Sequence, residues 1–436
     1  MNNAAKKAIS LLYDGGYEAY LVGGCVRDAL LGAPLNDFDI TTSALPNEML
    51  EVFSAYKTVL TGIKHGTVTV IMDGEPIEIT TFRSEGEYVD HRHPESVSFS
   101  RKLTDDLGRR DFTVNAMAYS EQSGLVDLFG GKDDLESKVI RAVGDPETRF
   151  TEDALRILRA LRFASQKDFI IEPATEKAIR QCLPLIRYVS VERIFSELKK
   201  LLMGKAACRI LIDYKDVIAF IIPQLSDCIG FDQQNPHHIY DVYDHIAHTV
   251  DHAPYDVTVR LAALLHDAGK PKTFSVKDGI GHFYGHTDAS LEIAQEVLTA
   301  LKCDSATKQS VLTLIKYHDP LIEPSEKAVK RALSKLGKPM LLNLLDLKAA
   351  DNLAQTPQCA ERLAGYEQIR SIIAQIEQKK ECFSLKDLKI NGDDLISLGI
   401  PRGKQIGIIL NALLCEVMDG RLENEEQALK SRAAQI

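Results

Sequence analysis

Residues 21–32 read LVGGCVRDALLG, and residues 36–42 read NDFDITT. An apolar run followed by two glycines predicts a strand, a tight turn and the start of a helix. Backbone N–H groups at the start of such a helix face outward and bind phosphate. Arg27 lies three or four residues into that helix, where its planar guanidinium can hold two phosphate oxygens. The segment around Gly23 and Gly24 therefore predicts a site for a phosphorylated ligand.

Asp37 and Asp39 are two residues apart on the next predicted strand, so both carboxylates project from the same face. At about 4 Å apart they would repel by roughly 4 kcal/mol at an effective dielectric constant of about 20, so a counter-cation is needed. Mg²⁺ held by carboxylates and substrate phosphates meets that need. Glu78, flanked by isoleucines on another predicted strand, can supply a third carboxylate. Asp37, Asp39 and Glu78 thus predict two-metal phosphoryl transfer, and the alternative is a plain turn beside a solvated strand edge.

Length and composition exclude several classes of protein. A chain of 436 residues with 45% hydrophobic and 26% charged side chains is folded, with roughly three domains at about 150 residues each. The formal charge of −10 argues against a protein that coats nucleic acid through bulk charge. The eight cysteines are scattered and no long apolar run is present, so we expect a cytoplasmic protein that does not enter a membrane.

The spacing of hydrophobic residues changes near residue 140, which predicts a sheet-containing head before it and only helices after it. The expected fold class is therefore α+β. In the head we expect a helix over 4–13, a strand over 19–22 and a hairpin of strands 67–72 and 77–82 around Asp73-Gly74. Beyond the head the predicted helices include residues 153–164, 173–182, 191–203, 240–252, 258–265 and 289–301.

Four ordered segments resemble the motifs of the poly(A) polymerase and tRNA nucleotidyltransferase family, in its bacterial and eukaryotic class. They lie at residues 21–42, 109–118 (RRDFTVNAMA), 127–135 (DLFGGKDDL) and 152–162 (EDALRILRALR). The resemblance implies a nucleotidyltransferase head with a mixed β-sheet, followed by a helical neck, body and tail. It implies Mg²⁺ as cofactor, CTP and ATP as substrates, and tRNA as partner. The residues that it implies in nucleotide binding within the first two motifs are Gly23, Gly24, Arg27, Arg110, Asp111 and Asn115.

Asp153, Arg156, Arg159 and Arg162 recur every third residue of one predicted helix, so neighbours along this row lie close together. Arginine and aspartate can present donor and acceptor edges to a nucleobase as another base does, which would let one pocket take C or A. In the resembling family, the residues matching Asp153 and Arg156 have this role. Those matching Arg110, Arg159 and Arg162 contact the nucleotide or its phosphates. A solvated, salt-bridged helix is the alternative for this row.

The loop at residues 86–101 resembles that of enzymes that add the complete CCA end, whereas CC-only relatives lack part of it. The resemblance therefore implies addition or repair of the 3′-terminal CCA of tRNA without a nucleic acid template. A partial adder of CC or A, and a poly(A) polymerase, are the alternatives within the class.

Histidines and aspartates between residues 245 and 351 occur in an order that resembles the HD metal-dependent phosphohydrolase domain. The matching residues are His245, His266, Asp267 and Asp351, with His286 and His318 fitting the extra ligands of two-metal members. Imidazole and carboxylate suit Ni, Mn, Co, Fe or Zn. The resemblance implies hydrolysis of cyclic or terminal phosphates at RNA ends. An inactive structural domain is one alternative, and a protein that is mainly an HD phosphohydrolase with an RNA-binding head is another.

Residues 389–407 resemble the C-terminal part of bacterial CCA-adding enzymes, which holds the tRNA body. Arg402 and Lys404, beside glycines at a predicted helix start, would contact backbone phosphates, unless this is only a turn between helices. The expected domains are a catalytic head (1–140), a helical neck and body for nucleotide selection and RNA binding (141–236), an HD metal-binding domain (237–355) and a tRNA-binding tail (356–436).

Overall fold

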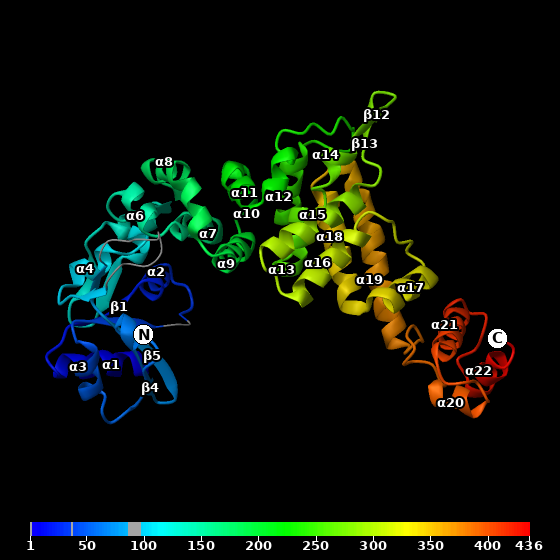
Figure 1. Cartoon of the computed structure of the whole chain (residues 1–436), viewed down its shortest axis with the longest axis horizontal. Coiled ribbons are helices and arrows are strands. Elements are labelled where there is room, and N and C mark those ends of the chain that lie inside the picture. The colour runs from blue at the N-terminus through cyan, green and yellow to red at the C-terminus, as the bar shows by residue number, and fades with distance from the viewer. Residues whose placement is uncertain (1, 36–37, 86–96) are drawn as a thin grey trace. The chain divides into compact units, whose positions relative to one another are not determined.

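The computed structural model describes residues 2–35, 38–85 and 97–436. Its contacts divide into two units, Met1–Ile221 and Ile222–Ile436, coloured blue to green and green to red in Figure 1. The first unit contains a mixed sheet and helices, and the second is mostly helical, so the expected α+β class is confirmed. The finer division at residues 140, 236 and 355 stays a prediction.

A seven-stranded sheet organises the first unit, in the order β3-β4-β5-β2-β1-β8-β9. β2 and β5 run parallel and every other neighbouring pair is antiparallel, as a mixed sheet requires. The strands are β1 (Ala19–Val22), β2 (Asp39–Thr42), β3 (Lys57–Val59), β4 (Thr67–Met72), β5 (Glu75–Thr81), β8 (Met117–Ser120) and β9 (Gly124–Asp127). The predicted first strand is confirmed.

The hairpin of β4 and β5 turns at Asp73 and Gly74, whose φ angles of 52° and 86° are those of the left-handed turn that Asp-Gly favours. Alternate β4 residues are buried, as a period of two predicts. Helix α1 (Asn3–Asp14) packs against the sheet through Ala5, Ala8 and Leu12, which recur on one helical face. The predicted hairpin and first helix are confirmed.

The rest of the first unit is helical, apart from two small strand pairs. These pairs are β6 (Arg83–Glu85) with β7 (Val97–Phe99), and β10 (Val139–Ile140) with β11 (Ile170–Ile171). The helices are α2 (Gly24–Leu30), α3 (Pro46–Val52), α4 (Leu103–Gly108), α5 (Gly131–Glu136), α6 (Pro146–Glu152), α7 (Leu155–Lys167), α8 (Pro173–Cys182), α9 (Val191–Leu202), α10 (Ala207–Asp213) and α11 (Lys215–Ile221).

The second unit is a helical array with one small hairpin. Its helices are α12 (Val242–His252), α13 (Val257–Leu265), α14 (Lys270–Thr273), α15 (His286–Ala300), α16 (Ser305–Tyr317), α17 (Glu326–Leu336), α18 (Lys338–Leu353), α19 (Arg362–Gln378), α20 (Gly392–Ser397), α21 (Lys404–Met418) and α22 (Glu426–Ala433). The hairpin of β12 (Ser275–Lys277) and β13 (Ile280–His282) and, in the first unit, the short strand β11 interrupt a region that we expected to be helical throughout. The hairpin turn is Asp278-Gly279, with φ angles of 55° and 78°, so the Asp-Gly signal was present in the sequence.

Two hydrophobic cores lie in the C-terminal half of the second unit. Leu341, Leu345 and Ile369 belong to a cluster built by α17, α18 and α19, whereas Leu395, Ile409 and others form a cluster between α20, α21 and α22. Each helical group therefore has apolar contacts of its own. Among the described residues, no helix is both long and apolar enough to cross a membrane.

The third sequence motif contains a glycine that packing requires. A Cβ at Gly131 would lie 2.2 Å from the carbonyl oxygen of Thr113, whereas at Gly108 the nearest atom would be 3.5 Å away, in Phe129. We expect Gly131→Ala to lower the free energy of unfolding of the first unit by about 1–3 kcal/mol, as overpacking does. Gly108→Ala is the matched control, compared by thermal unfolding followed by circular dichroism. Equal melting temperatures would contradict the close approach of α5 to Thr113.

Candidate active site

The two-glycine turn lies between β1 and α2, as predicted. Gly23 has φ 73° and ψ −132°, a conformation that side chains disfavour. A Cβ there would also lie 2.9 Å from Nη1 of Arg110. Glycine at this position therefore lets the Arg110 guanidinium approach the backbone at the start of α2.

Asp39 begins β2 and lies directly beside Glu78 of β5 in the parallel register. Thr41 and Thr80 are the next pair on the same face, because residues two apart on a strand project to the same side. Asp39, Thr41 and Thr80 line a cavity of about 1050 Å³. Asp39 and Glu78 thus project from the face on which this cavity opens. Asp37 and residues 86–96 of the predicted loop lie outside the described residues.

The cavity of the first unit is strongly basic. Nine basic side chains line it against three acidic ones. The basic residues are Arg27, Arg83, Arg109, Arg110, Arg156, Arg159, Arg162, Arg193 and Lys200. An excess of guanidinium groups provides paired donors for phosphate oxygens, so the cavity suits a triphosphate.

Asp111 is buried in the wall of this cavity and orders three predicted nucleotide-binding side chains. Its Oδ2 accepts from Nε and Nη2 of Arg159 at 2.8 and 2.5 Å, and its Oδ1 accepts from Nδ2 of Asn115 at 3.0 Å. Asn115 Oδ1 in turn accepts from Nη1 of Arg27 at 2.5 Å. Burial would raise the pKa of Asp111, but the charge of Arg159 and these hydrogen bonds lower it to about 2. The carboxylate therefore stays ionised and fixes its partners.

Asp106 has the same role for the adjacent pair of arginines. Its side chain is fully buried and pairs with Nη2 of Arg109 at 2.8 Å and Nη2 of Arg110 at 3.3 Å. Burial opposes ionisation, yet the two guanidinium charges hold the pKa of Asp106 below its ordinary value. A buried anion thus orients two cations that line the cavity.

The prediction that Asp153 lies on a helix with the three arginines is wrong. Asp153 has an extended backbone, with φ −137° and ψ 101°, and lies in the break between α6 and α7. Its Oδ1 accepts the N–H of Leu155, the first residue of α7, at 3.1 Å. Its Oδ2 pairs with Nη2 of Arg193 on α9 at 2.9 Å. Asp153 still lines the cavity, because the break directs it there.

Arg156, Arg159 and Arg162 all lie on α7 and line the cavity, as their spacing predicts. Arg156 donates through Nη1 to Glu152 at 2.6 Å and through Nη2 to the carbonyl of Arg109 at 2.9 Å. Arg162 pairs with Glu197 at 3.1 Å, and its Cζ lies 4.0 Å from the centre of the Phe163 ring. These contacts hold the guanidinium groups in defined orientations.

Sequence reasoning assigned no role to several residues of this site. They are Arg83, Arg109, Arg193 and Lys200 in the lining, and Asp106 and Glu197 behind it. Asp106 precedes Arg109 and Arg110 by three and four residues, a spacing that predicts ion pairs on a helical turn. No comparable local signal marks Arg193, since its partner is forty residues away in the chain.

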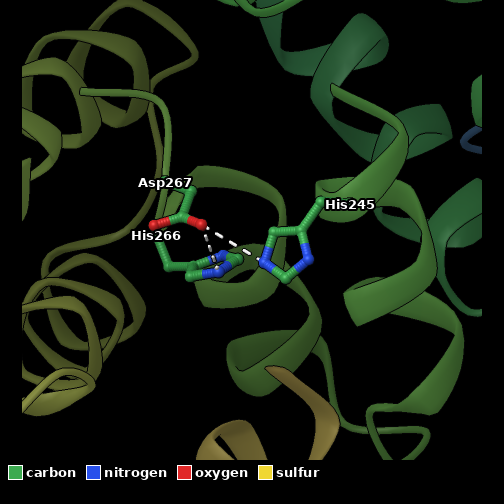
Figure 2. Close-up of side chains that lie close together, drawn as sticks. All are labelled: His245, His266 and Asp267. Atoms are coloured by element: carbon green, nitrogen blue, oxygen red, sulfur yellow. Dashed lines mark ion pairs between the residues drawn. The ribbon is translucent and has the colours of Figure 1, made fainter. Parts of the chain in front are cut away.

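A second site lies in the second unit, where the predicted HD residues meet. Figure 2 shows the Asp267 carboxylate directed towards the rings of His245 and His266. Oδ2 of Asp267 is 3.2 Å from Nε2 of each of these histidines. Asp351, from α18, places Oδ1 3.1 Å from Nε2 of His245. His245 belongs to α12, and His266 and Asp267 follow α13.

The other oxygen of Asp267 faces a second pair of histidines. Oδ1 is 3.6 Å from Nε2 of His286 and 3.8 Å from Nε2 of His318, and these two nitrogens are 3.3 Å apart. The ligand atoms of His245, His266 and Asp267 lie close enough together to hold one metal ion, and so do those of Asp267, His286 and His318. We call each of these sets a ligand trio, and Asp267 is shared by the two candidate metal positions. We call these six residues the HD cluster: His245, His266, Asp267, His286, His318 and Asp351.

All four histidines of the HD cluster direct Nε2 inward. Each Nδ1 contacts a backbone carbonyl, and these carbonyls belong to Ala354, Ala263, Phe283 and Ile315. A carbonyl can only accept, so Nδ1 carries the proton and leaves Nε2 able to bind a metal. Burial alone would lower the pKa of His266, but Asp267 and Asp351 raise it to about 10. The site therefore attracts positive charge, which a divalent ion would supply.

The predicted tail residues are accessible. Arg402 is exposed just before α21, and Lys404 begins that helix and is exposed as well. Their contact with tRNA stays a prediction.

Three family descriptions match parts of the chain. They are the Poly A polymerase head domain at residues 19–141, the probable RNA and SrmB-binding site of polymerase A at 168–228, and the putative tRNA nucleotidyltransferase domain 2 at 277–433. Among curated proteins, the CCA-adding enzyme of Ligilactobacillus salivarius is 35% identical across 99% of this chain and 96% of its own length. That of Levilactobacillus brevis is 36% identical across 98% and 96%. A crystal structure of the Bacillus stearothermophilus CCA-adding enzyme in complex with CTP matches with a TM-score of 0.75 and 30% identity, covering 100% of this chain and 98% of that one.

The pKa of Asp111 predicts how stability depends on pH. A carboxyl group with a lowered pKa stabilises the fold above its unfolded value of 3.8, and this stabilisation is lost as the pH falls towards 2. The shift corresponds to about 2 kcal/mol. We therefore expect the difference in unfolding free energy between wild type and Asp111→Asn to shrink by about that amount from pH 5 to pH 2, measured by urea titration.

The exposed Asp133 of α5 supplies the control, Asp133→Asn. A difference between wild type and Asp111→Asn that stays constant over this pH range would contradict the ion pair with Arg159.

Proposed function

Because the chain belongs to the CCA-adding enzymes, a family of nucleotidyltransferases, we propose that it builds and repairs the 3′-terminal CCA of tRNA from CTP and ATP. The observation that carries this proposal is the arginine-lined cavity of the first unit, which opens beside Asp39. A basic cavity next to a carboxylate suits a nucleoside triphosphate and a divalent ion together. We propose that the reaction takes place in the cytoplasm, where tRNA and nucleoside triphosphates are both present.

Asp39, with Asp37 and Glu78, would hold Mg²⁺ in this proposal. The donor set fits, since Mg²⁺ prefers carboxylate and phosphate oxygens and Asp39 lies at the cavity in register with Glu78. Bound Mg²⁺ would lower the pKa of the attacking 3′-hydroxyl and neutralise charge on the departing pyrophosphate.

The remaining residues would bind and select the nucleotide. Arg27, Arg110, Arg159 and Arg162 hold the triphosphate, and the Gly23-Gly24 turn lets the backbone approach it. Asp153 and Arg156 face the base. Their orientation is supported by the contact of Asp153 with Arg193 and by the two hydrogen bonds of Arg156. Fixed donors and acceptors could distinguish C and A from G and U without a template.

Asp39→Asn tests the catalytic part of this proposal. It keeps the size of the side chain and removes the charge, so we expect loss of both CTP and ATP incorporation by at least about a hundredfold, as for a transition-state interaction. Binding of tRNA should stay within about twofold, because docking depends on other phosphate contacts. The assay is sequencing of tRNA 3′ ends after incubation with CTP, ATP or both. Wild-type enzyme that incorporates a single nucleotide type would overturn the proposal of complete CCA addition.

We propose a second activity for the second unit, a metal-dependent phosphohydrolase acting on RNA ends. The two ligand trios that share Asp267 support it. Imidazole and carboxylate donors suit Ni, Mn, Co, Fe or Zn, and such ions would supply Lewis-acid activation of water and of a phosphoryl oxygen. Neighbouring groups of the protein hold the metal-binding side chains in place. Backbone carbonyls fix the histidine rings, and Lys270 pairs with Asp267 at 2.7 Å.

Metal content distinguishes a shared carboxylate from two independent sites. Asp267→Ala should lose both ions because it removes a ligand from each trio, whereas His286→Ala should lose only one. The measurement is mass-spectrometric metal analysis after loading with Ni²⁺, Mn²⁺ or Co²⁺. His252→Gln, an exposed histidine of α12, is the control.

Hydrolysis of adenosine 2′,3′-cyclic phosphate by the same variants reports whether the site is active. If His286→Ala lost both ions or neither, the proposed sharing would be wrong.

A further inference from the structure

Two stacked rings line the cavity that is also lined by Asp267, His286, His318 and Asp351 of the HD cluster. His282 ends β13 and Tyr284 follows two residues later, with ring centroids 5.2 Å apart and ring planes only 10° from parallel. Tyr284 is nevertheless 73% exposed. A ring that is stacked on one side and still largely exposed presents its other side to solvent, where a planar group can bind.

These rings share one cavity with the HD cluster. The cavity has a volume of about 350 Å³, and both His282 and Tyr284 line it together with Asp267, His286 and Asp351. A ligand that places a phosphate at the HD cluster can therefore extend towards the rings. Lys270, Lys348 and Arg362 also line the cavity, where they balance the charges of Asp267, Asp319 and Asp351.

The backbone that carries the rings is held firmly. A Cβ at Gly281 would lie 2.1 Å from the carbonyl oxygen of Gln233, so β13 is packed directly against that segment. The Gly281 N–H donates to the carbonyl of Gln234 at 2.7 Å, and the Gly281 carbonyl accepts from Asn235 at 3.0 Å. A surface fixed in this way loses little conformational entropy when a ligand stacks on it.

The residue between the two rings contacts other parts of the unit. The Phe283 ring lies 5.5 Å from that of Phe274, which in turn lies 5.2 Å from Phe231. The Lys270 ammonium is 5.1 Å from the centre of the Phe283 ring. Phe283 therefore anchors the segment, and His282 and Tyr284 remain available on it.

We propose that Tyr284, backed by His282, is a platform on which the nucleobase of a substrate stacks while its phosphate lies at the HD cluster. Aromatic side chains bind the bases of single-stranded nucleic acid in this way, with little preference among bases. The substrates of this site are then nucleotides at RNA ends rather than phosphate esters in general. The inference rests on the proposed metal site for the position of the phosphate.

A binding experiment tests the platform without relying on hydrolysis. The chain contains no tryptophan, so Tyr284→Trp introduces a single indole at the platform. With Zn²⁺ present, adenosine 2′,3′-cyclic phosphate should quench its fluorescence in a saturable manner, and ribose 5-phosphate, which has no base, should not. His252→Trp places the indole on the exposed end of α12 as the matched control and should respond to neither. Unchanged emission of Tyr284→Trp at millimolar nucleotide would overturn the proposal.

Steady-state kinetics of the hydrolysis distinguish loss of the base-stacking platform from loss of the metal site. Tyr284→Ala should raise KM for adenosine 2′,3′-cyclic phosphate about tenfold, the effect of one lost base stack, and should retain the wild-type metal content. Tyr284→Phe should restore the KM, because the ring and not the hydroxyl provides the surface. Equal KM values for Tyr284→Ala and wild type would overturn the platform. Absence of hydrolysis by the wild type would instead refute the phosphohydrolase, and the fluorescence titration would still decide whether a base binds at position 284.

Discussion

Positive charge concentrated in one cavity has to be held in place by buried negative charge, and the first unit depends on this constraint. Asp106, Asp111 and Glu197 are all buried, and each pairs with at least one arginine of the cavity wall. The guanidinium groups are thereby oriented, yet the lining keeps a large excess of positive charge. Removing one partner of such a buried pair typically costs about 3–5 kcal/mol, because it leaves an uncompensated charge. The cavity and the fold of the first unit are therefore stabilised by the same contacts.

The second unit applies the same principle with the charges reversed. There Asp267 faces four imidazole nitrogens, and Asp351 lies near two of them. Every ring is also held by a backbone carbonyl at its Nδ1. The Asp267 carboxylate is only 2% exposed, so it requires positive partners on both of its oxygens. Lys270 pairs with Oδ2 at 2.7 Å, and the raised pKa of His266 favours a second positive charge beside that oxygen. Burial and the charge of His266 lower the pKa of His318, which faces Oδ1, to about 4. Divalent ions would satisfy the same requirement.

Short sequence patterns were sufficient to predict the features that depend only on residues close together in the chain. The glycine turn, the hairpin at Asp73-Gly74 and the row from Arg156 to Arg162 follow from the conformational freedom of glycine and from the periods of strands and helices. The position of Asp153 could not be predicted in this way, because its extended backbone accompanies a hydrogen bond from the Leu155 N–H and an ion pair with Arg193, which is distant in the sequence. The order of histidines and aspartates identified all six residues of the HD cluster. The sharing of Asp267 by two ligand trios could not be predicted from that order, because it depends on how α12, α13, α15, α16 and α18 pack against one another.

The most direct test is a crystal structure of the protein with Mg²⁺ and a non-hydrolysable CTP analogue. The account predicts that the triphosphate lies against Arg27, Arg110 and Arg159, with the ion beside Asp39 and the base near Asp153 and Arg156. A triphosphate bound elsewhere, with the arginine-lined cavity empty, would contradict it.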